Sequence, residues 1–202
     1  MKATNAVTLP DETTVGIRLA DQADRDALLA GFERLSPTSR FRRFFTGIPY
    51  LSDQMVDRLT AIDQHHHVAV GVFDPTRPSD IDRPDGLGVG VGRYIVSDRD
   101  QSRAEFAVAV IDEYQGHGIG TLLLQALVLI AHQRGIETFT ADVLAENHGM
   151  ISVLHRFGAT RVHLGSDPTE LSYELAIADA TAALEDHPNH PALTELADQL
   201  PT

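Results

Sequence analysis

One short segment rich in glycine carries the clearest chemical signal in the sequence. It reads Gln115-Gly116-His117-Gly118-Ile119-Gly120-Thr121 and directly precedes a long apolar stretch that is typical of a buried helix, with Gly135 as its end. Because glycine has no Cβ, its backbone N–H group can approach a ligand closely. At the start of a helix such groups have no intrahelical acceptor, and the helix dipole favours an anion there. The segment therefore predicts a cradle for a pyrophosphate group.

Two other glycine-rich phosphate sites do not fit this spacing. A dinucleotide-binding turn needs its third glycine three positions after the second and an acidic residue about twenty residues later. Here the third glycine, Gly120, follows Gly118 by two positions. A phosphate loop would continue with a lysine, which is absent. The remaining alternative to a pyrophosphate cradle is a plain tight turn.

The same segment resembles the coenzyme A loop of the GNAT superfamily of N-acetyltransferases. Gln115, Gly118 and Gly120 match its pattern of Gln or Arg, two residues, Gly, one residue, then Gly or Ala. The resemblance extends over residues 15–177. It implies an α/β fold, the GNAT acyl-CoA N-acyltransferase fold, in which helices flank a mixed, mostly antiparallel sheet with splayed central strands.

The resemblance also implies how acetyl-CoA, the co-substrate, is held, and it implies no metal. Residues 115–121 would bind the pyrophosphate, while the backbone of Val108, Ala109 and Val110 would pair with the pantetheine arm as an added strand does. Asn147 would reach the arm from the other side.

A closer resemblance concerns the amine acceptor. Residues 35–45, 104–107 and 141–147 are similar to stretches of bacterial protein lysine acetyltransferases that modify acyl-CoA synthetases. This implies a protein lysine as acceptor. Many of those enzymes also carry a cyclic-nucleotide-binding or synthetase-like regulatory domain, and we find no such segment in these 202 residues.

Glu105 is the candidate catalytic residue. An unperturbed lysine has a pKa of about 10.4, so a base that removes its proton accelerates attack on a thioester by roughly 10²–10⁴-fold. Glu105 lies in the otherwise apolar run 104–110, where a carboxylate is costly unless it is paired or functional. The resemblance implies that a glutamate here acts as the base, and the alternative is an outward-facing carboxylate on the polar side of the strand.

Two further roles complete the predicted chemistry. A backbone N–H among residues 108–110 would stabilise the oxyanion. The family often places a tyrosine as general acid where this chain has Leu154, so the general acid stays unassigned. Because the chain has no cysteine, we expect direct transfer within a ternary complex rather than an acyl-enzyme.

Composition narrows the partners. The formal net charge is −13, from 29 acidic and 16 basic residues, which disfavours nucleic acid and anionic membranes and favours a cationic amine. No run of eighteen apolar residues and no signal pattern occurs, so we expect a cytoplasmic protein. Two alternatives stay open, namely an acetyltransferase for a small amine such as a polyamine or antibiotic, and a non-catalytic acyl-CoA sensor.

The remaining expectations concern organisation. Residues 14–178 form the predicted N-acetyltransferase domain, after a flexible tail at 1–13 and before an acidic appendage at 179–202 that could serve as a homodimer contact. Ser36 and Ser52 are expected to cap helices. We expect histidines 65–67 to be surface residues, and arginines 40, 42 and 43 to form a solvated face. Strands are predicted at residues 15–19, 68–73, 86–96, 104–110, 138–144, 161–164 and 171–177, and helices after Asp21, Ser36 and Ser52 and at 118–134 and 147–157.

Overall fold

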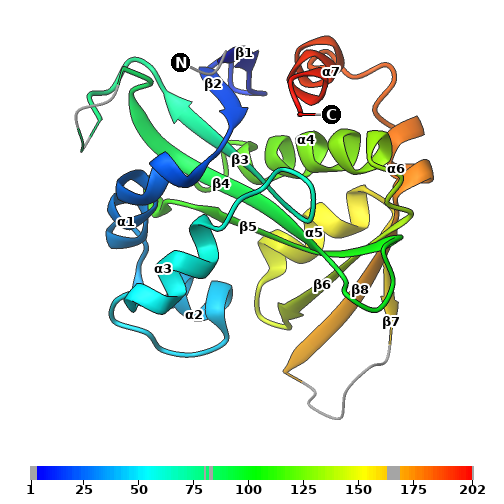
Figure 1. Ribbon diagram of the computed structural model, residues 1–202, viewed down its shortest axis with the longest axis horizontal. Coiled ribbons are helices and arrows are strands. Elements are labelled where there is room, and N and C mark those ends of the chain that lie inside the picture. Colours follow the sequence, from blue (N-terminus) through cyan, green and yellow to red (C-terminus); the bar gives the residue numbers. More distant parts are fainter. Residues whose placement is uncertain (1–3, 80, 82–83, 163–168, 202) are drawn as a thin grey trace.

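The computed structural model describes residues 4–79, 81, 84–162 and 169–201. They form an eight-stranded sheet in the order β1-β2-β3-β4-β5-β6-β8-β7, flanked by helices (Figure 1). The strands are β1 (Asn5–Thr8), β2 (Thr14–Leu19), β3 (His67–Asp74), β4 (Leu87–Val96), β5 (Arg103–Val110), β6 (Thr138–Leu144), β7 (Thr160–Val162) and β8 (Glu170–Ala176). The α-helices are α1 (Arg25–Glu33), α2 (Pro37–Phe44), α3 (Asp53–Thr60), α4 (Ile119–Gln133), α5 (His148–Arg156), α6 (Ile177–Ala182) and α7 (His190–Asp198), and two short 3₁₀ turns are η1 (Gln22–Asp24) and η2 (Asp112–Tyr114).

The central strands separate after a short parallel pairing. Every neighbouring pair of strands is antiparallel except β5 and β6. The β5–β6 register runs only from Arg103↔Thr138 to Glu105↔Thr140. On its other side β5 stays paired with β4 as far as Val110↔Gly90. The mixed sheet with a splayed centre, expected from the resemblance, is confirmed, and the splay begins at Glu105.

Helix α4 is the centre of the main core. Its apolar positions are buried nearly all round, as expected of a helix covered by a sheet on one side and by other helices on the other. It packs against β3, β4 and β5 and against α5, α6 and α7. The predicted end of this helix is confirmed, because Gly135 has a left-handed backbone with φ 73°.

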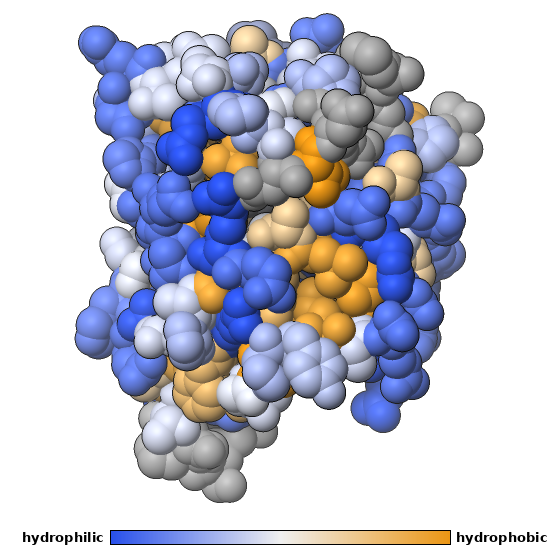
Figure 2. Space-filling model, turned by 90° about the vertical axis from the view of Figure 1, so that its left-hand side faces the viewer, coloured by the Kyte–Doolittle hydropathy of each residue, from blue (hydrophilic) through white to orange (hydrophobic). Residues whose placement is uncertain are grey.

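Helices α1, α2 and α3 cover the opposite side and have their own smaller core (Figure 1). Its buried members are Phe32, Leu35, Leu51 and Val56. The predicted caps are confirmed, since the side chains of Ser36 and Ser52 accept hydrogen bonds from the backbone of Ser39 and Met55. Figure 2 views the molecule from the side of α1 and shows an apolar patch within a mostly hydrophilic surface.

Both ends of the chain differ from the sequence-based expectation. Residues 5–8, predicted as part of a flexible tail, form β1, which pairs with β2 and buries Val7. Residues 1–3 of that tail lie outside the described residues. The predicted C-terminal appendage instead contributes to the main core through α6 and α7, which bury Ala180, Leu193 and Leu196. Both segments are short and polar, and their apolar side chains are buried by contacts with the body of the domain and with each other: β1 contacts β2 and α7, and α6 and α7 contact α4.

Candidate active site

A groove with a volume of about 850 Å³ follows the open edge of β5. Its walls come from β5, from the loop between η2 and α4, from β6 and from the start of α5. The predicted site residues that line it are Glu105, Val108, Ala109, Val110, Gln115, Gly116, His117, Gly118, Gly120, Thr121 and Asn147. Ile119 is different, because its side chain is buried in the main core and only its backbone belongs to the loop.

Residues 115–121, called the glycine loop below, have positive φ angles at two of their glycines. Gly116 and Gly118 have φ angles of 85° and 93°, in the region that disfavours residues with a side chain. Gly118 is the N-cap of α4, so no side chain satisfies the first N–H groups of this helix. A Cβ on Gly116 or Gly120 would meet no atom within 4 Å. No packing within the protein therefore requires glycine at these two positions. The absence of a side chain instead leaves open space beside the first N–H groups of α4.

Two polar side chains fix the loop to α2: Asp112, which was not predicted as a site residue, and Gln115, which was predicted to bind the cofactor. Asp112 accepts hydrogen bonds from the Ser36 N–H at 2.7 Å, from Ser36 Oγ at 2.8 Å and from Ser39 Oγ at 2.9 Å. Burial raises the pKa of Asp112, but these donated hydrogen bonds outweigh it and hold the pKa below its ordinary value. Gln115 Nε2 donates to Ser39 Oγ at 3.0 Å and to the Val110 carbonyl at 3.1 Å. Gln115 thus spans the end of β5 and the start of α2.

A second anchor lies at Tyr114. Its hydroxyl donates to Asp74 Oδ2 at 2.5 Å and ties η2 to the end of β3. Burial and the Asp74 carboxylate raise the pKa of Tyr114 to about 12. Tyr114 is therefore engaged as a structural donor. The position where the family places a tyrosine acid, Leu154, is fully buried, so the general acid stays unassigned.

A carboxylate from the β1–β2 turn lies against the glycine loop. His117 Nδ1 is 2.7 Å from Asp11 Oδ2. The hydrogen bond with His117 lowers the pKa of Asp11 to about 2. Next to it, Pro10 lies 3.0 Å from the position that a Cβ on Gly118 would take. Asp11 was expected in a flexible tail, so a negative charge at the predicted pyrophosphate site was not expected from the sequence.

Glu105 is the last residue of β5 that pairs with β6, and its side chain is exposed on the groove. The face of β5 that it shares with Ala107 and Ala109 is turned toward α2, since these residues line the same space as Arg43. The positive charge of Arg43 interacts electrostatically with Glu105. The carboxylate thus lies where the groove meets the opening between the strands.

The side-chain oxygen of Asn147 caps a helix, so only its N–H groups are left to bind a ligand. Its Oδ1 accepts a hydrogen bond from the Met150 N–H at 3.2 Å and caps α5. The carboxamide N–H groups are the donors that it can direct to a substrate in the groove.

Several positively charged residues differ from the expected solvated surface. Arg40 donates to the carbonyls of Leu35 and Pro49 and lies over the Phe32 ring, so it holds the α2–α3 connection. Arg43 lines the active-site groove together with Glu105 and also an interior space beneath α1. His67, expected at the surface, is buried, with Nδ1 3.1 Å from the Ala61 carbonyl oxygen. The predictions for these residues were wrong because their burial depends on how α2 and α3 pack over the sheet.

Known proteins are similar to this chain in sequence and in fold. Residues 51–159 match the model of the acetyltransferase (GNAT) family. Acetyltransferase Pat of Mycolicibacterium smegmatis is 38% identical over 88 residues, which are 43% of this chain and 26% of that protein. This chain therefore matches about a quarter of that relative. An acetyltransferase of Pseudomonas aeruginosa is 28% identical over 171 residues, 84% of this chain and 87% of that protein.

Solved structures of other proteins have the same fold as this chain. The GNAT domain of S. lividans PAT superimposes with a TM-score of 0.74 and 28% identity, covering 86% of this chain and 96% of that one. A Salmonella typhimurium structure described as a putative acetyltransferase with its cofactor acetyl-CoA has the same fold, with a TM-score of 0.62, 19% identity and coverage of 81% and 94%. No helix within the described residues is both long enough and apolar enough to cross a membrane. The family match spans more than half of this chain, and the chain therefore belongs to the GNAT acetyltransferase family.

Proposed function

We propose that this GNAT acetyltransferase transfers the acetyl group of acetyl-CoA to the side chain of a protein lysine, with Glu105 as the base. The observation that carries the proposal is the opening of the sheet at Glu105, with the glycine loop at the far end of the same strand. A thioester laid along the open edge of β5 would then end beside a carboxylate.

The fit of the groove to coenzyme A rests on unsatisfied backbone groups at two places. Residues 106–110 of β5 lie beyond the last pairing with β6, so their outward backbone groups can pair with the amides of a pantetheine arm. The start of α4 offers N–H groups to a diphosphate, and the open space at Gly116 and Gly120 lets it approach. These features support binding of the co-substrate by residues 108–110 and 115–121.

The proposed reaction is a direct acyl transfer. Glu105 accepts a proton from the lysine ammonium, and the freed nitrogen lone pair attacks the thioester carbonyl carbon. A β5 backbone N–H stabilises the resulting oxyanion. When the tetrahedral intermediate collapses, the C–S bond breaks, the nitrogen gives up its second proton to solvent, and the departing thiolate takes a proton from solvent. The products are the acetamide of the lysine and free coenzyme A. The chain has no cysteine to form an acyl-enzyme.

The acceptor class rests on similarity and on the open groove. The Pat relative and the GNAT domain of S. lividans PAT support a protein substrate. The groove is wide, and two exposed carboxylates, Asp142 and Glu170, lie on its wall, which favours approach of a cationic side chain. A small amine would be better served by a closed pocket.

Glu105→Gln tests the proposed chemistry. The amide keeps the size of the side chain but cannot take a proton, so we expect transfer to fall by roughly 10²–10⁴-fold while coenzyme A binding stays within about twofold. Transfer is measured with labelled acetyl-CoA and a host lysate, and binding by calorimetry. Unchanged transfer in the variant would remove Glu105 from the mechanism. Absence of label in any protein, with a small amine labelled instead, would overturn the lysine acceptor.

A further inference from the structure

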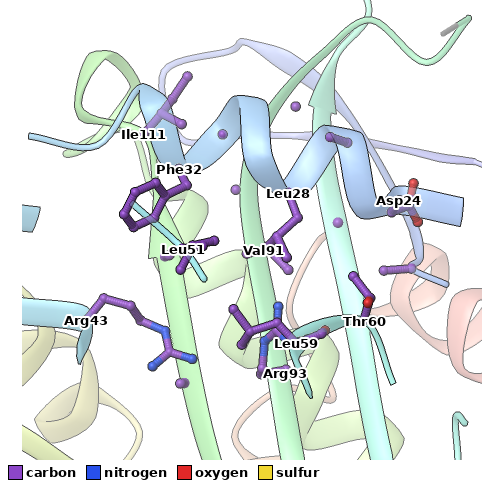
Figure 3. A pocket seen from close by; sticks show the side chains of 18 of the residues that line it. Asp24, Leu28, Phe32, Arg43, Leu51, Leu59, Thr60, Val91, Arg93 and Ile111 are labelled. Carbon is purple, nitrogen blue, oxygen red and sulfur yellow. The ribbon is translucent and has the colours of Figure 1, made fainter. Parts of the chain in front are cut away.

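A second, smaller space lies beneath α1, between the helices and the sheet. This chamber has a volume of about 100 Å³, and its walls are mainly apolar side chains, including Leu28, Phe32 and Val91. Figure 3 shows α1 across its top, with Phe32 and Leu28 directed inward, and shows Arg43 and Arg93 reaching it from the opposite side. An apolar chamber with two guanidinium groups at one end is an unusual combination.

Arg93 has no countercharge among the described residues, whereas Arg43 interacts electrostatically with Glu105 on the side of the groove. Arg93 is only 5% exposed, and its Nη1 lies 2.6 Å from the Leu59 carbonyl oxygen and 3.4 Å from His67 Nε2, which are both uncharged partners when His67 is neutral. Burial, with a contribution from the Arg43 charge, lowers the pKa of Arg93 to about 9. Burial also lowers the pKa of Arg43. Within the part of the chain that the structure describes, neither arginine forms an ion pair.

The carboxylates near the chamber are engaged elsewhere or lie outside it. Asp24 pairs with Arg18 through hydrogen bonds of 2.7 and 2.9 Å. The side chain of Asp21 accepts from the Ala23 N–H and caps η1. Glu105 interacts with Arg43 but lies on the groove side and does not line the chamber. Arg93 therefore carries a buried positive charge without a countercharge, a costly arrangement in a folded protein.

The chamber borders the active-site groove. Arg43, Ala107 and Ala109 line both spaces. The two alanines are the β5 residues that follow Glu105 on its face of the strand, so the boundary between the two spaces lies next to the proposed base. Their small side chains leave room for a narrow aliphatic group to pass.

We propose that this chamber binds a carboxylate on a short aliphatic chain, which accepts charge-assisted hydrogen bonds from Arg43 and Arg93 while its methylene groups contact Leu28 and Phe32. Two sources offer this chemistry, namely a dicarboxylic acyl group on the donor thioester and an amine acceptor that carries a carboxylate. This proposal rests on the proposed function for one point, the location of the transfer reaction next to the chamber. The chamber and its two arginines are features of the structure itself.

The direct test uses the protein without coenzyme A and the probes butyrate and glutarate, with butanamide as the neutral control. We expect saturable binding of at least one carboxylate by calorimetry or NMR and none of butanamide. Arg43→Gln should weaken binding at least tenfold, since a guanidinium–carboxylate contact is charge-assisted. Arg58→Gln, which removes the same charge from an exposed position on α3, is the matched control and should bind as the unaltered protein does. No saturable carboxylate binding, or equal binding in both variants, would overturn the inference.

Two further arms identify the source. The donor arm compares succinyl-CoA with butyryl-CoA, and the acceptor arm compares 5-aminovalerate with pentylamine. We expect at least a tenfold advantage of the carboxylate-bearing partner in kcat/KM in one arm, lost in Arg43→Gln and kept in Arg58→Gln. Transfer of acetyl groups without a carboxylate preference in either arm contradicts the inference but leaves the proposed function standing. Carboxylate binding without any transfer supports the chamber and counts against the proposed function.

Discussion

At the residue scale, the candidate site brings together charged side chains from distant parts of the chain. Glu105 is the one carboxylate in the otherwise apolar end of β5. Asp11 precedes His117 by more than a hundred residues and meets it through the β1–β2 turn. Arg43 and Arg93 come from α2 and β4 and line one chamber. The charge at each place in the site is therefore set by tertiary packing.

Asp11→Asn is expected to tighten coenzyme A binding. The Asp11 carboxylate lies beside the loop proposed to hold a diphosphate, and like charges repel there. Because the site is exposed and screened, we expect an increase in affinity of about two- to fivefold, larger at low salt. Titration by calorimetry at two ionic strengths measures it. Weaker binding in this variant would mean that Asp11 acts mainly by orienting His117 as a donor.

At the element scale, helix boundaries were predictable and the supports of the glycine loop were not. Ser36, Ser52 and Gly135 act through hydrogen bonds and backbone conformation within a few residues, so their roles follow from local sequence. Asp112 and Tyr114 support the loop through partners on α2 and β3. Histidines 65–67 gave no local sign that one of them would be buried. Local signals predict elements, and long-range contacts decide how a site is held.

The contact between Tyr114 and Asp74 makes a pH-dependent contribution to stability. Burial raises the pKa of Asp74, but the hydrogen bonds from Tyr114 and Thr76 outweigh it and leave the pKa below its ordinary value. A depressed pKa means that the stabilisation is present above the unfolded-state value of about 3.9 and is lost as pH falls through the folded-state value. We expect Asp74→Asn to lower the Tm at pH 7. Below pH 4 the difference in Tm between the variant and the unaltered protein should become smaller, because Asp74 of the unaltered protein becomes protonated as the pH falls. A constant difference in Tm from pH 7 to pH 3 would contradict this.

At the scale of the whole molecule, the family resemblance led to the correct sheet but not to both ends of the chain. The mixed sheet follows from alternating strand patterns and one recognisable loop. Strand β1 has four residues and becomes a strand only by pairing with β2. The last helix, α7, looks polar in sequence but buries Leu193 and Leu196 against α4 and β1. Short terminal segments acquire their structure from the body of the domain.

Leu196→Ala tests whether α7 belongs to the folded domain. The Leu196 side chain is fully buried, so its truncation should cost about 2–5 kcal/mol of unfolding free energy. Glu195→Ala, an exposed neighbour on the same helix, should change stability by less than about 0.5 kcal/mol. Urea unfolding followed by circular dichroism measures both. Equal effects of the two substitutions would show that α7 is not packed on the core.

The central claim is that backbone N–H groups bared by glycine at the start of α4 hold the diphosphate of coenzyme A while β5 pairs with its pantetheine arm. The most direct measurement is a calorimetric titration of the protein with coenzyme A and, in parallel, with pantetheine, which lacks the diphosphate and the adenosine 3′-phosphate, and with 4′-phosphopantetheine, which restores one phosphate of the diphosphate alone. We predict saturable binding of coenzyme A and binding of pantetheine at least about a hundredfold weaker, a difference of about 2.7 kcal/mol. Equal affinity for coenzyme A and pantetheine, or no heat with either, would contradict the account.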